Sequence, residues 1–148
     1  MRRIVLDSRA RTPLKSKVVS DEFAALTTIV VGRSVPAKCV AALARKVSVV
    51  RAPLRGGRID LRWLLRKLGG ENVTSLLIEG GGEVNASFLL GGLAHRVVFF
   101  YAPKILGGRD ARKAVAGDGA RSLSDVLNLT EVEWRRVGSD LMMTARMK

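Results

Sequence analysis

The sequence predicts an α/β fold, with a mixed, mainly parallel sheet flanked by helices and a C-terminal antiparallel hairpin. Two observations lead to this prediction. Through the first hundred or so residues, short β-branched runs alternate with segments of helical periodicity, which is typical of parallel strands joined by helices. Nearer the C-terminus, residues 131–137 and 141–147 form two strand-like runs separated by Gly138-Ser139-Asp140, and this arrangement predicts a hairpin.

The first strands are apolar runs that end in polar or glycine residues. Residues 3–8 (Arg-Ile-Val-Leu-Asp-Ser) predict a strand that leads into a polar loop, and residues 28–32 predict a second strand. An alanine-rich helix is expected over residues 37–46, followed directly by a β-branched strand at 47–50. The predicted order is therefore strand, strand, helix, strand.

A further helix is predicted after Asp60, whose side chain suits an N-cap. Its apolar residues have helical spacing: Leu61, Leu64, Leu65 and Leu68. The pair Gly69-Gly70 is expected to end this helix. Similar reasoning predicts a strand over 76–79, a short helix over 83–90, a strand over 97–101 and a helical turn over 122–127.

The composition, with 47% hydrophobic and 26% charged residues, is typical of one globular domain, which we expect to span residues 1–148. No apolar run reaches the roughly 18 residues that would suggest a membrane span. We therefore expect a cytoplasmic protein that does not bind membranes. With Cys39 as the only cysteine and His95 as the only histidine, an intrachain disulfide and a Cys/His zinc site are excluded.

The net charge of +13 predicts attraction to phosphorylated ligands or to polyanions. The arginines are scattered along the chain, and only 5% of the residues are aromatic, which leaves few side chains on which nucleic-acid bases could stack. A basic nucleic-acid-binding domain is therefore the less favoured alternative. An arginine-rich, solvated surface with no ligand is the simplest explanation of the charge.

The segment most informative about chemistry is Gly80-Gly81-Gly82, between the predicted strand at 76–79 and the predicted helix at 83–90. Glycines let the backbone approach a pyrophosphate closely, and the first N–H groups of a helix favour phosphate charge. The usual dinucleotide fingerprint is incomplete, because Asn85 stands where its third glycine belongs. The spacing alone allows two interpretations of this segment. It is either an anion-binding turn, to which Ser87 adds a hydroxyl donor, or a tight turn that binds nothing.

Glu79 ends the predicted strand just before this turn. Ligands of α/β sheets commonly bind beyond the carboxyl ends of the strands, so the Glu79 carboxylate is a candidate contact for a substrate amine or amide. The alternative is a carboxylate that faces water or an arginine.

Three segments of the chain form a recognisable set. They are residues 3–8 with Arg-Thr-Pro at 11–13, Leu-Ile-Glu-Gly-Gly-Gly at 77–82 with Asn85 and Phe88, and Ala-Pro-Lys-Ile-Leu-Gly-Gly at 102–108. In order and spacing this set resembles the riboflavin-biosynthesis pyrimidine reductases, a family with a dihydrofolate-reductase-like fold. The resemblance runs from about residue 2 to residue 146.

The resemblance implies an NADPH-dependent oxidoreductase. Its substrate would be a 5-amino- or 2,5-diamino-6-ribosylaminopyrimidine 5′-phosphate, whose ribosylamino side chain is reduced to the ribitylamino form by hydride transfer to the sugar C1′. By matching position, Ser8 would contact the cofactor and Glu79 the substrate. The cofactor pyrophosphate would be lined by Gly81, Gly82, Glu83, Val84, Asn85, Ala86 and Ser87.

Two further expectations concern partners and cofactor choice. Family members are typically dimers, so the resemblance implies a homodimer, to which the apolar run at 97–101 could contribute unless it is an ordinary buried strand. Three arginines near strand ends, Arg33, Arg51 and Arg55, are equal candidates for contact with the 2′-phosphate of NADPH. An ordinary surface charge is the alternative for each of them.

The family pattern also includes a longer portion before the segment that matches residues 3–8. That portion carries a first sheet strand and contributes to the substrate pocket and the cofactor site, and the 148 residues contain no counterpart. The chain is therefore expected to be an N-terminally truncated reductase domain. The alternatives are completion by a partner and a non-catalytic NADP-binding or scaffold relative.

Overall fold

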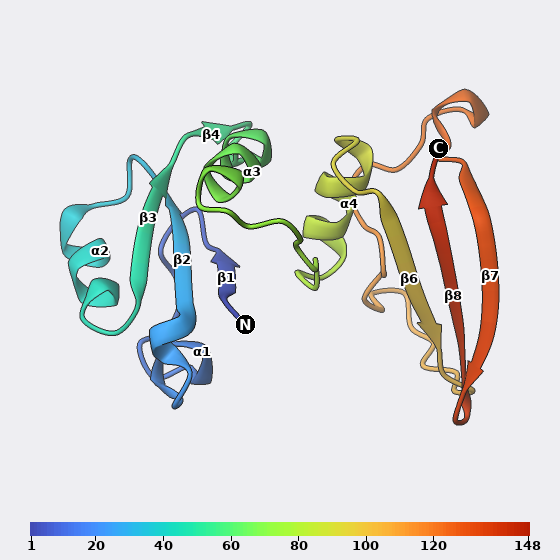
Figure 1. Ribbon diagram of the computed structural model, residues 1–148, viewed down its shortest axis with the longest axis horizontal. Coiled ribbons are helices and arrows are strands. Elements are labelled where there is room, and N and C mark those ends of the chain that lie inside the picture. Colours follow the sequence, from blue (N-terminus) through green and yellow to red (C-terminus); the bar gives the residue numbers. More distant parts are fainter. The chain divides into compact units, whose positions relative to one another are not determined.

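The computed structural model describes all 148 residues, and the chain forms two compact units, Met1–Leu76 and Leu77–Lys148. Figure 1 shows the helices and strands of each unit. The α/β class is confirmed, because parallel strands with helices make up the first unit and antiparallel strands dominate the second. A single domain over residues 1–148 stays a prediction. None of the helices is long and apolar enough to cross a membrane.

The first unit is built on a parallel sheet with the strand order β1-β2-β3. Ile4 of β1 lies opposite Thr28 of β2, and Val30 of β2 lies opposite Val50 of β3. Every residue of β2 is buried, as a central strand covered on both faces requires. The elements of this unit are β1 (Arg3–Leu6), α1 (Lys17–Ser20), η1 (Ala24–Leu26), β2 (Thr27–Gly32), α2 (Ala37–Ala44), β3 (Ser48–Ala52), β4 (Leu54–Arg55), β5 (Arg58–Ile59) and α3 (Leu61–Gly70).

The core of this unit has two layers, because neighbouring residues of β2 point to opposite faces of the sheet. On one face Ile29 and Val31 pack with Val19 of α1 and Leu43 of α2. On the other face Val30 packs with Leu64 and Leu68 of α3, together with Ala52 and Ile59. The helical spacing of the leucines therefore predicted correctly which face of α3 is buried.

The C-terminal cap of α3 differs from the prediction. Gly69 and Gly70 are both helical, and the residue with positive φ is Asn72 (φ 61°). Val73 N–H donates to the Leu68 carbonyl, and Asn72 N–H donates to the Gly69 carbonyl, each at 3.0 Å. This bonding pattern is a Schellman motif with asparagine in the left-handed position, and Val73 packs against the core beside Leu68. The helix therefore ends at Gly70, as predicted, but the residue in the left-handed position of its cap is Asn72 and not a glycine.

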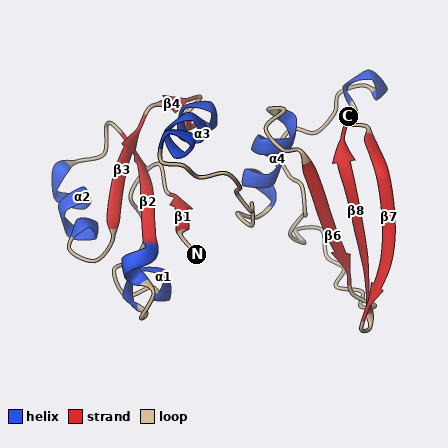
Figure 2. Ribbon diagram, in the orientation of Figure 1, coloured by secondary structure: helices blue, strands red, loops and turns tan.

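The second unit contains an antiparallel sheet with the strand order β6-β8-β7. Its elements are α4 (Gly82–Leu90), β6 (Arg96–Tyr101), η2 (Leu123–Asp125), β7 (Leu129–Val137) and β8 (Asp140–Met147). Val137 pairs with Asp140, so β7 and β8 form the predicted hairpin, with Gly138 at φ 61° in its turn. Figure 2 shows that the chain between β6 and β7 is mostly loop.

The predicted strand at 76–79 is wrong. Residues 73–79 have no regular secondary structure, no strand pairs with them, and Leu77 is 72% exposed. An apolar pattern predicts that a segment can enter a sheet, but a strand forms only where a neighbour accepts and donates its backbone hydrogen bonds. Three short elements, α1, η1 and the β4–β5 hairpin, were not predicted.

Candidate functional site

The turn into α4 presents the helix N-terminus without a side-chain cap. Gly81 occupies the N-cap position with φ 80° and ψ 175°, a conformation that L side chains rarely adopt. Asn85 N–H donates to the Gly81 carbonyl at 2.9 Å, which closes the first turn. An α-helix has no intrahelical acceptors for its first N–H groups, and the N-cap residue Gly81 has no side chain with which to cap them. This arrangement suits an anion.

Gly82 permits a close approach between α4 and a distant part of the chain. A Cβ at this position would lie 2.4 Å from the carbonyl oxygen of Lys113 and 3.1 Å from the Ala116 Cβ. Any larger residue would therefore displace residues 113–117, which we call the 113–117 segment. Packing within the protein alone therefore requires a glycine at this position.

Three hydrogen bonds hold the 113–117 segment against the first turn of α4. The Asn85 side-chain Nδ2 donates to the Ala114 carbonyl at 2.9 Å. Ala116 N–H donates to the Gly82 carbonyl at 3.0 Å, and Gly117 N–H donates to Glu83 Oε1 at 3.4 Å. Residues separated by about thirty positions are thus joined at the predicted cradle.

The seven residues predicted to line a pyrophosphate all lie at or near this first turn, but their side chains differ in what they can offer. Asn85 directs its amide to Ala114, and Ala86 is buried at 1% exposure. The Ser87 hydroxyl donates to the Glu83 carbonyl at 2.8 Å, so the hydroxyl donor expected for an anion is engaged with its own helix. The side chains of Asn85, Ala86 and Ser87 are therefore not available to an anion, and any donors for it would come from the backbone at the start of α4.

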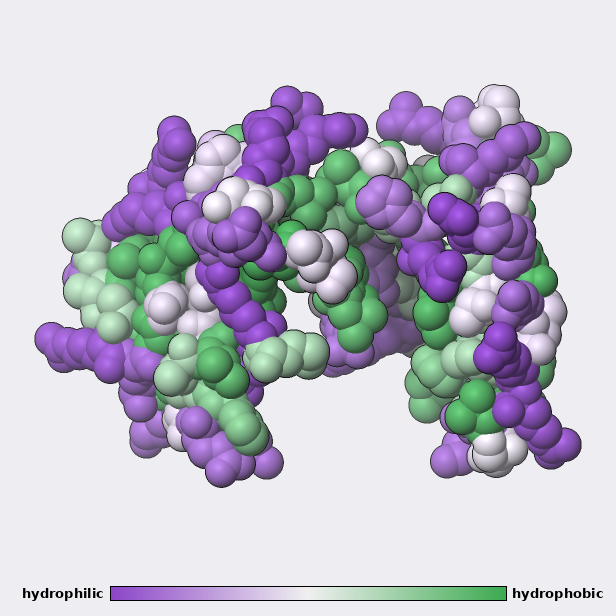
Figure 3. Space-filling model, viewed as in Figure 1, coloured by the Kyte–Doolittle hydropathy of each residue, from purple (hydrophilic) through white to green (hydrophobic).

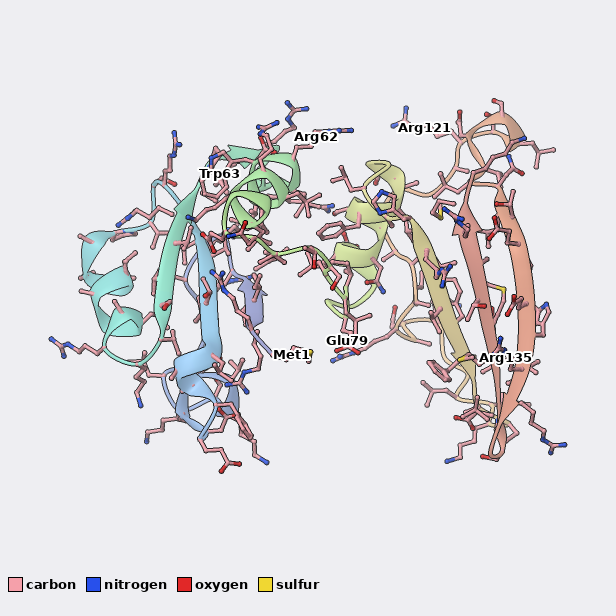
Figure 4. All side chains as sticks on the ribbon, in the orientation of Figure 1. Met1, Arg62, Trp63, Glu79, Arg121 and Arg135 are labelled. Atoms are coloured by element: carbon pink, nitrogen blue, oxygen red, sulfur yellow. The ribbon has the colours of Figure 1, made fainter.

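Glu79, labelled in Figure 4, is exposed and lies just before the glycine turn. Its carboxylate has neither a hydrogen bond nor an ion pair. It does not end a strand as predicted, but it is close in sequence to the cradle and free to meet a ligand. Its role toward a substrate stays a prediction.

Ser8 belongs to the first unit, where it follows β1 at the carboxyl end of the parallel sheet. Its carbonyl accepts from Gly32 N–H at 3.1 Å, and a Cβ on Gly32 would approach the same oxygen to 2.8 Å. The preceding Asp7 is buried and accepts from the Thr12 N–H and hydroxyl, each at 2.7 Å. These contacts fix the loop that carries Ser8.

Burial disfavours ionisation of Asp7, but the hydrogen bonds from Thr12 and from the backbone of Arg11, Thr12 and Arg9 outweigh it, so the Asp7 pKa is lowered. The loop after β1 is thus organised around a carboxylate that stays charged at neutral pH.

The three candidate arginines are not equivalent. Arg51 donates from one guanidinium nitrogen to the Arg33 carbonyl at 2.6 Å and to the Val35 carbonyl at 2.7 Å, so it supports the loop after β2. Arg33 is exposed directly after β2, at the carboxyl end of the parallel sheet, where α/β sheets bind ligands. Arg55 is also exposed, but it lies in the β4–β5 hairpin that follows β3, and its charge contributes to the lowered pKa of Asp60. The structure therefore distinguishes a supporting Arg51 from two arginines available to an anion.

Positive charge is concentrated in the first unit. Met1–Leu76 holds 16 of the 26 Lys and Arg residues but only five of the 13 Asp and Glu residues, so it carries +11 of the net +13. Four of these five acids are bound to protein groups: Asp7, Asp21, Asp60 and Glu71. Figure 3 shows hydrophilic side chains over β4 and the start of α3. The excess cations make this unit attractive to phosphorylated ligands.

Sequence reasoning missed the 113–117 segment. Its residues, Lys-Ala-Val-Ala-Gly, carry no motif and lie in an irregular loop, so no pattern linked them to α4. Asn85 was identified, but only as a residue that lines the ligand.

Comparison with known proteins places these features in one family. Residues 1–143 match the family described as the RibD C-terminal domain. The chain is 41% identical over 146 residues to the 2,5-diamino-6-ribosylamino-4(3H)-pyrimidinone 5′-phosphate reductase of Methanothermobacter thermautotrophicus, covering 99% of this chain and 66% of that protein. It is 33% identical to the riboflavin biosynthesis protein RibD of Actinobacillus pleuropneumoniae, covering 95% of this chain and 38% of that protein.

Solved structures show the same fold. The structure of Acinetobacter baumannii RibD superposes with a TM-score of 0.75 at 20% identity, over 99% of this chain and 38% of that one. The expected dihydrofolate-reductase-like fold is thereby confirmed. The chain spans just under two thirds of the length of the Methanothermobacter reductase and a smaller share of the RibD proteins.

Proposed function

The chain belongs to the RibD C-terminal domain family, and we propose that it acts as an NADPH-dependent reductase of riboflavin biosynthesis. Its substrate is a 6-ribosylaminopyrimidine 5′-phosphate that carries a 5-amino or a 2,5-diamino group. The observation that supports this proposal most is the uncapped N-terminus of α4 behind Gly81, within the matched region.

The residues present fit a dinucleotide phosphate. The N-cap residue Gly81 has no side chain that could cap the first N–H groups of α4, and the helix dipole favours negative charge there. Bound NADPH would supply the hydride that reduces the sugar C1′. The chain's own part is to hold the pyrophosphate at Gly82, Glu83 and Val84 and to orient the substrate through Glu79.

The preference for NADPH over NADH is assigned to Arg33 and Arg55. Both are exposed in the unit that carries most of the positive charge, Arg33 directly after β2 and Arg55 in the hairpin that follows β3. Arg51 is left out because its guanidinium is bound to the carbonyls of Arg33 and Val35. Ser8, in the loop after β1 of the same unit, is proposed as a further cofactor contact.

We also propose a homodimer formed through the outer edge of β6. This edge strand, Arg-Val-Val-Phe-Phe-Tyr, has a charge only at its first residue, and Phe100 is 61% exposed. The opposite edge strand, β7, is protected by charged residues and by an irregularity between Thr130 and Glu133, where Glu131 has φ 50°. Proteins use such devices to block edge pairing, so their absence from β6 favours pairing there.

A turnover assay tests the function. The 148-residue chain is incubated with NADPH and the diamino substrate of the Methanothermobacter reductase, and NADPH absorbance and the mass of the pyrimidine product are followed. We expect NADPH loss in step with formation of the ribitylamino product. NADPH binding without turnover would instead identify a non-catalytic relative, and absence of both would overturn the proposal.

A further inference from the structure

The Asn85 side chain is engaged with the protein and not directed toward a ligand. Its Nδ2 donates to the Ala114 carbonyl at 2.9 Å, across 29 positions of sequence. Asn85 is half-buried, and its backbone N–H is bound to Gly81. A role in cofactor binding must therefore pass through the residues that Asn85 holds.

The 113–117 segment depends on few contacts for its position. It lies in the irregular chain between β6 and η2, where most residues are exposed. The bond from Asn85 is the shortest of three hydrogen bonds that link the segment to α4; the other two are from Ala116 N–H to the Gly82 carbonyl and from Gly117 N–H to Glu83 Oε1. Loss of the Asn85 amide would thus loosen the segment at its centre.

Lys113 begins this segment, and its backbone is in contact with the first turn of α4. Its carbonyl lies 2.4 Å from the place that a Cβ on Gly82 would occupy. The Lys113 side chain is exposed and forms no ion pair. A lysine ammonium is a mobile point charge on a long stem, well suited to a phosphate bound a few ångströms from its backbone.

We propose that Asn85 is a positioning residue that fixes the 113–117 segment so that Lys113 contributes its positive charge to the anion bound at the N-terminus of α4. The inference rests on the proposed function of this turn. It assigns Lys113, which lies in a segment without any binding motif, to the cofactor site. It also explains why an asparagine stands where the usual fingerprint has a glycine, because only a side chain can reach Ala114.

A double-mutant cycle on the full 148-residue chain tests this relationship. NADPH binding is measured by calorimetry for wild type, Asn85→Ala, Lys113→Ala and the double variant, at low and at moderate salt. We expect each single variant to weaken binding by roughly three- to tenfold and the double variant to be no weaker than Lys113→Ala. The NADPH affinity of all three variants should also depend less on salt than that of wild type, and by the same amount, because each variant loses the same charge contact.

Asn128→Ala is the matched control, because Asn128 Nδ2 also donates to a backbone carbonyl, that of Val126, in the same unit. We expect its NADPH affinity to equal that of wild type. Hydrogen exchange without cofactor gives a second readout. Asn85→Ala should speed exchange of the Ala116 and Gly117 amides, whereas Lys113→Ala should leave them protected.

The outcomes separate this inference from the proposed function. Wild-type binding with additive effects of Asn85→Ala and Lys113→Ala would show that Asn85 contacts the ligand directly and would overturn the inference alone. Wild-type binding that Asn85→Ala leaves unchanged would also overturn it. If wild type fails to bind NADPH while Asn85→Ala still loosens the 113–117 segment, the proposed function fails, and the assignment of Lys113 to a cofactor fails with it.

Discussion

Gly82 lies so close to Lys113 that a Cβ at position 82 would be 2.4 Å from the Lys113 carbonyl oxygen. The N-terminus of α4 and the 113–117 segment are therefore packed together at the point where an anion is proposed to bind. A substitution at Gly82 must move one of them.

Gly82→Ala is expected to weaken NADPH binding by about tenfold, because the added methyl group displaces the segment that carries Lys113. Gly70→Ala is the control, since a Cβ on this helical glycine of α3 meets nothing within 4 Å. Its affinity should be unchanged and its melting temperature equal or slightly higher. Equal NADPH affinities for Gly82→Ala and wild type, measured by calorimetry, would contradict the packing argument.

Substitutions of Arg51 and Arg33 are expected to affect different properties, the first the stability of the fold and the second the preference for NADPH over NADH. Arg51→Ala removes two hydrogen bonds to loop carbonyls, and we expect the free energy of unfolding in urea to fall by about 1–2 kcal/mol. Arg33→Ala should change stability by less than about 0.5 kcal/mol while lowering the preference for NADPH over NADH severalfold. The assignment is wrong if Arg51→Ala alters cofactor preference and leaves stability untouched.

Stability should fall on acidification because of carboxylates in the first unit. The pKa of Asp21 is lowered by its hydrogen bond from Arg3, that of Asp60 by the Trp63 N–H, and that of Glu71 by Lys67 and Arg2. A group with a lowered pKa in the folded state stabilises the fold above its unfolded pKa and loses this contribution as the pH drops through the folded value. We expect constant stability from neutral pH to about 5 and a decline below about 4.

Asp7→Asn tests the contribution of the buried carboxylate to this decline. Asparagine keeps an oxygen that can accept from Thr12 but does not titrate, so the variant should be less stable at neutral pH and should show a shallower loss below about pH 4. Glu22→Asn, at an exposed position in the same unit, serves as the control. Urea unfolding at a series of pH values gives the measurement, and identical slopes for Asp7→Asn and wild type would refute the assignment.

The dimer interface can be tested with two valines of equal exposure. Val98 on β6 and Val132 on β7 are each 47% exposed. A lysine on an unprotected edge blocks strand pairing, so Val98→Lys should shift the chain from dimer to monomer in sedimentation equilibrium, whereas Val132→Lys should not. A monomeric wild type, or the same shift for both variants, would exclude β6 as the interface.

Elements were predicted correctly where the spacing of apolar residues along the element matches the face that is buried. The leucines of α3 and the β-branched run of β2 are examples, since periodicity records which face meets the core. The segment at 76–79 is equally apolar, but no strand pairs with its backbone, and the sequence of the segment does not show whether a pairing strand is present. The sequence predicted that α3 ends at Gly69-Gly70, and it does, but the left-handed cap residue is Asn72, which tolerates positive φ and whose neighbour Val73 packs against the core.

The candidate site was predicted to a similar extent. The glycines predicted a turn into a helix, and Gly81 indeed occupies the N-cap of α4, while anion binding at this turn stays a prediction. Asn85 and Arg51 bind backbone carbonyls in loops distant in sequence. Because every residue has a backbone carbonyl, the residue types do not indicate which one accepts the hydrogen bond. Roles that depend on such contacts could be assigned only from the structure.

The central claim is that NADPH binds at the N-terminus of α4, and a titration of the 148-residue chain with NADPH tests it most directly. Fluorescence of Trp63 and Trp134 is followed in wild type and in Gly82→Asp, which places a carboxylate against the proposed pyrophosphate site, with circular dichroism to confirm that the variant folds. Saturable binding by wild type that is lost in folded Gly82→Asp is the predicted result. No binding by wild type, or equal binding by both, would contradict the claim.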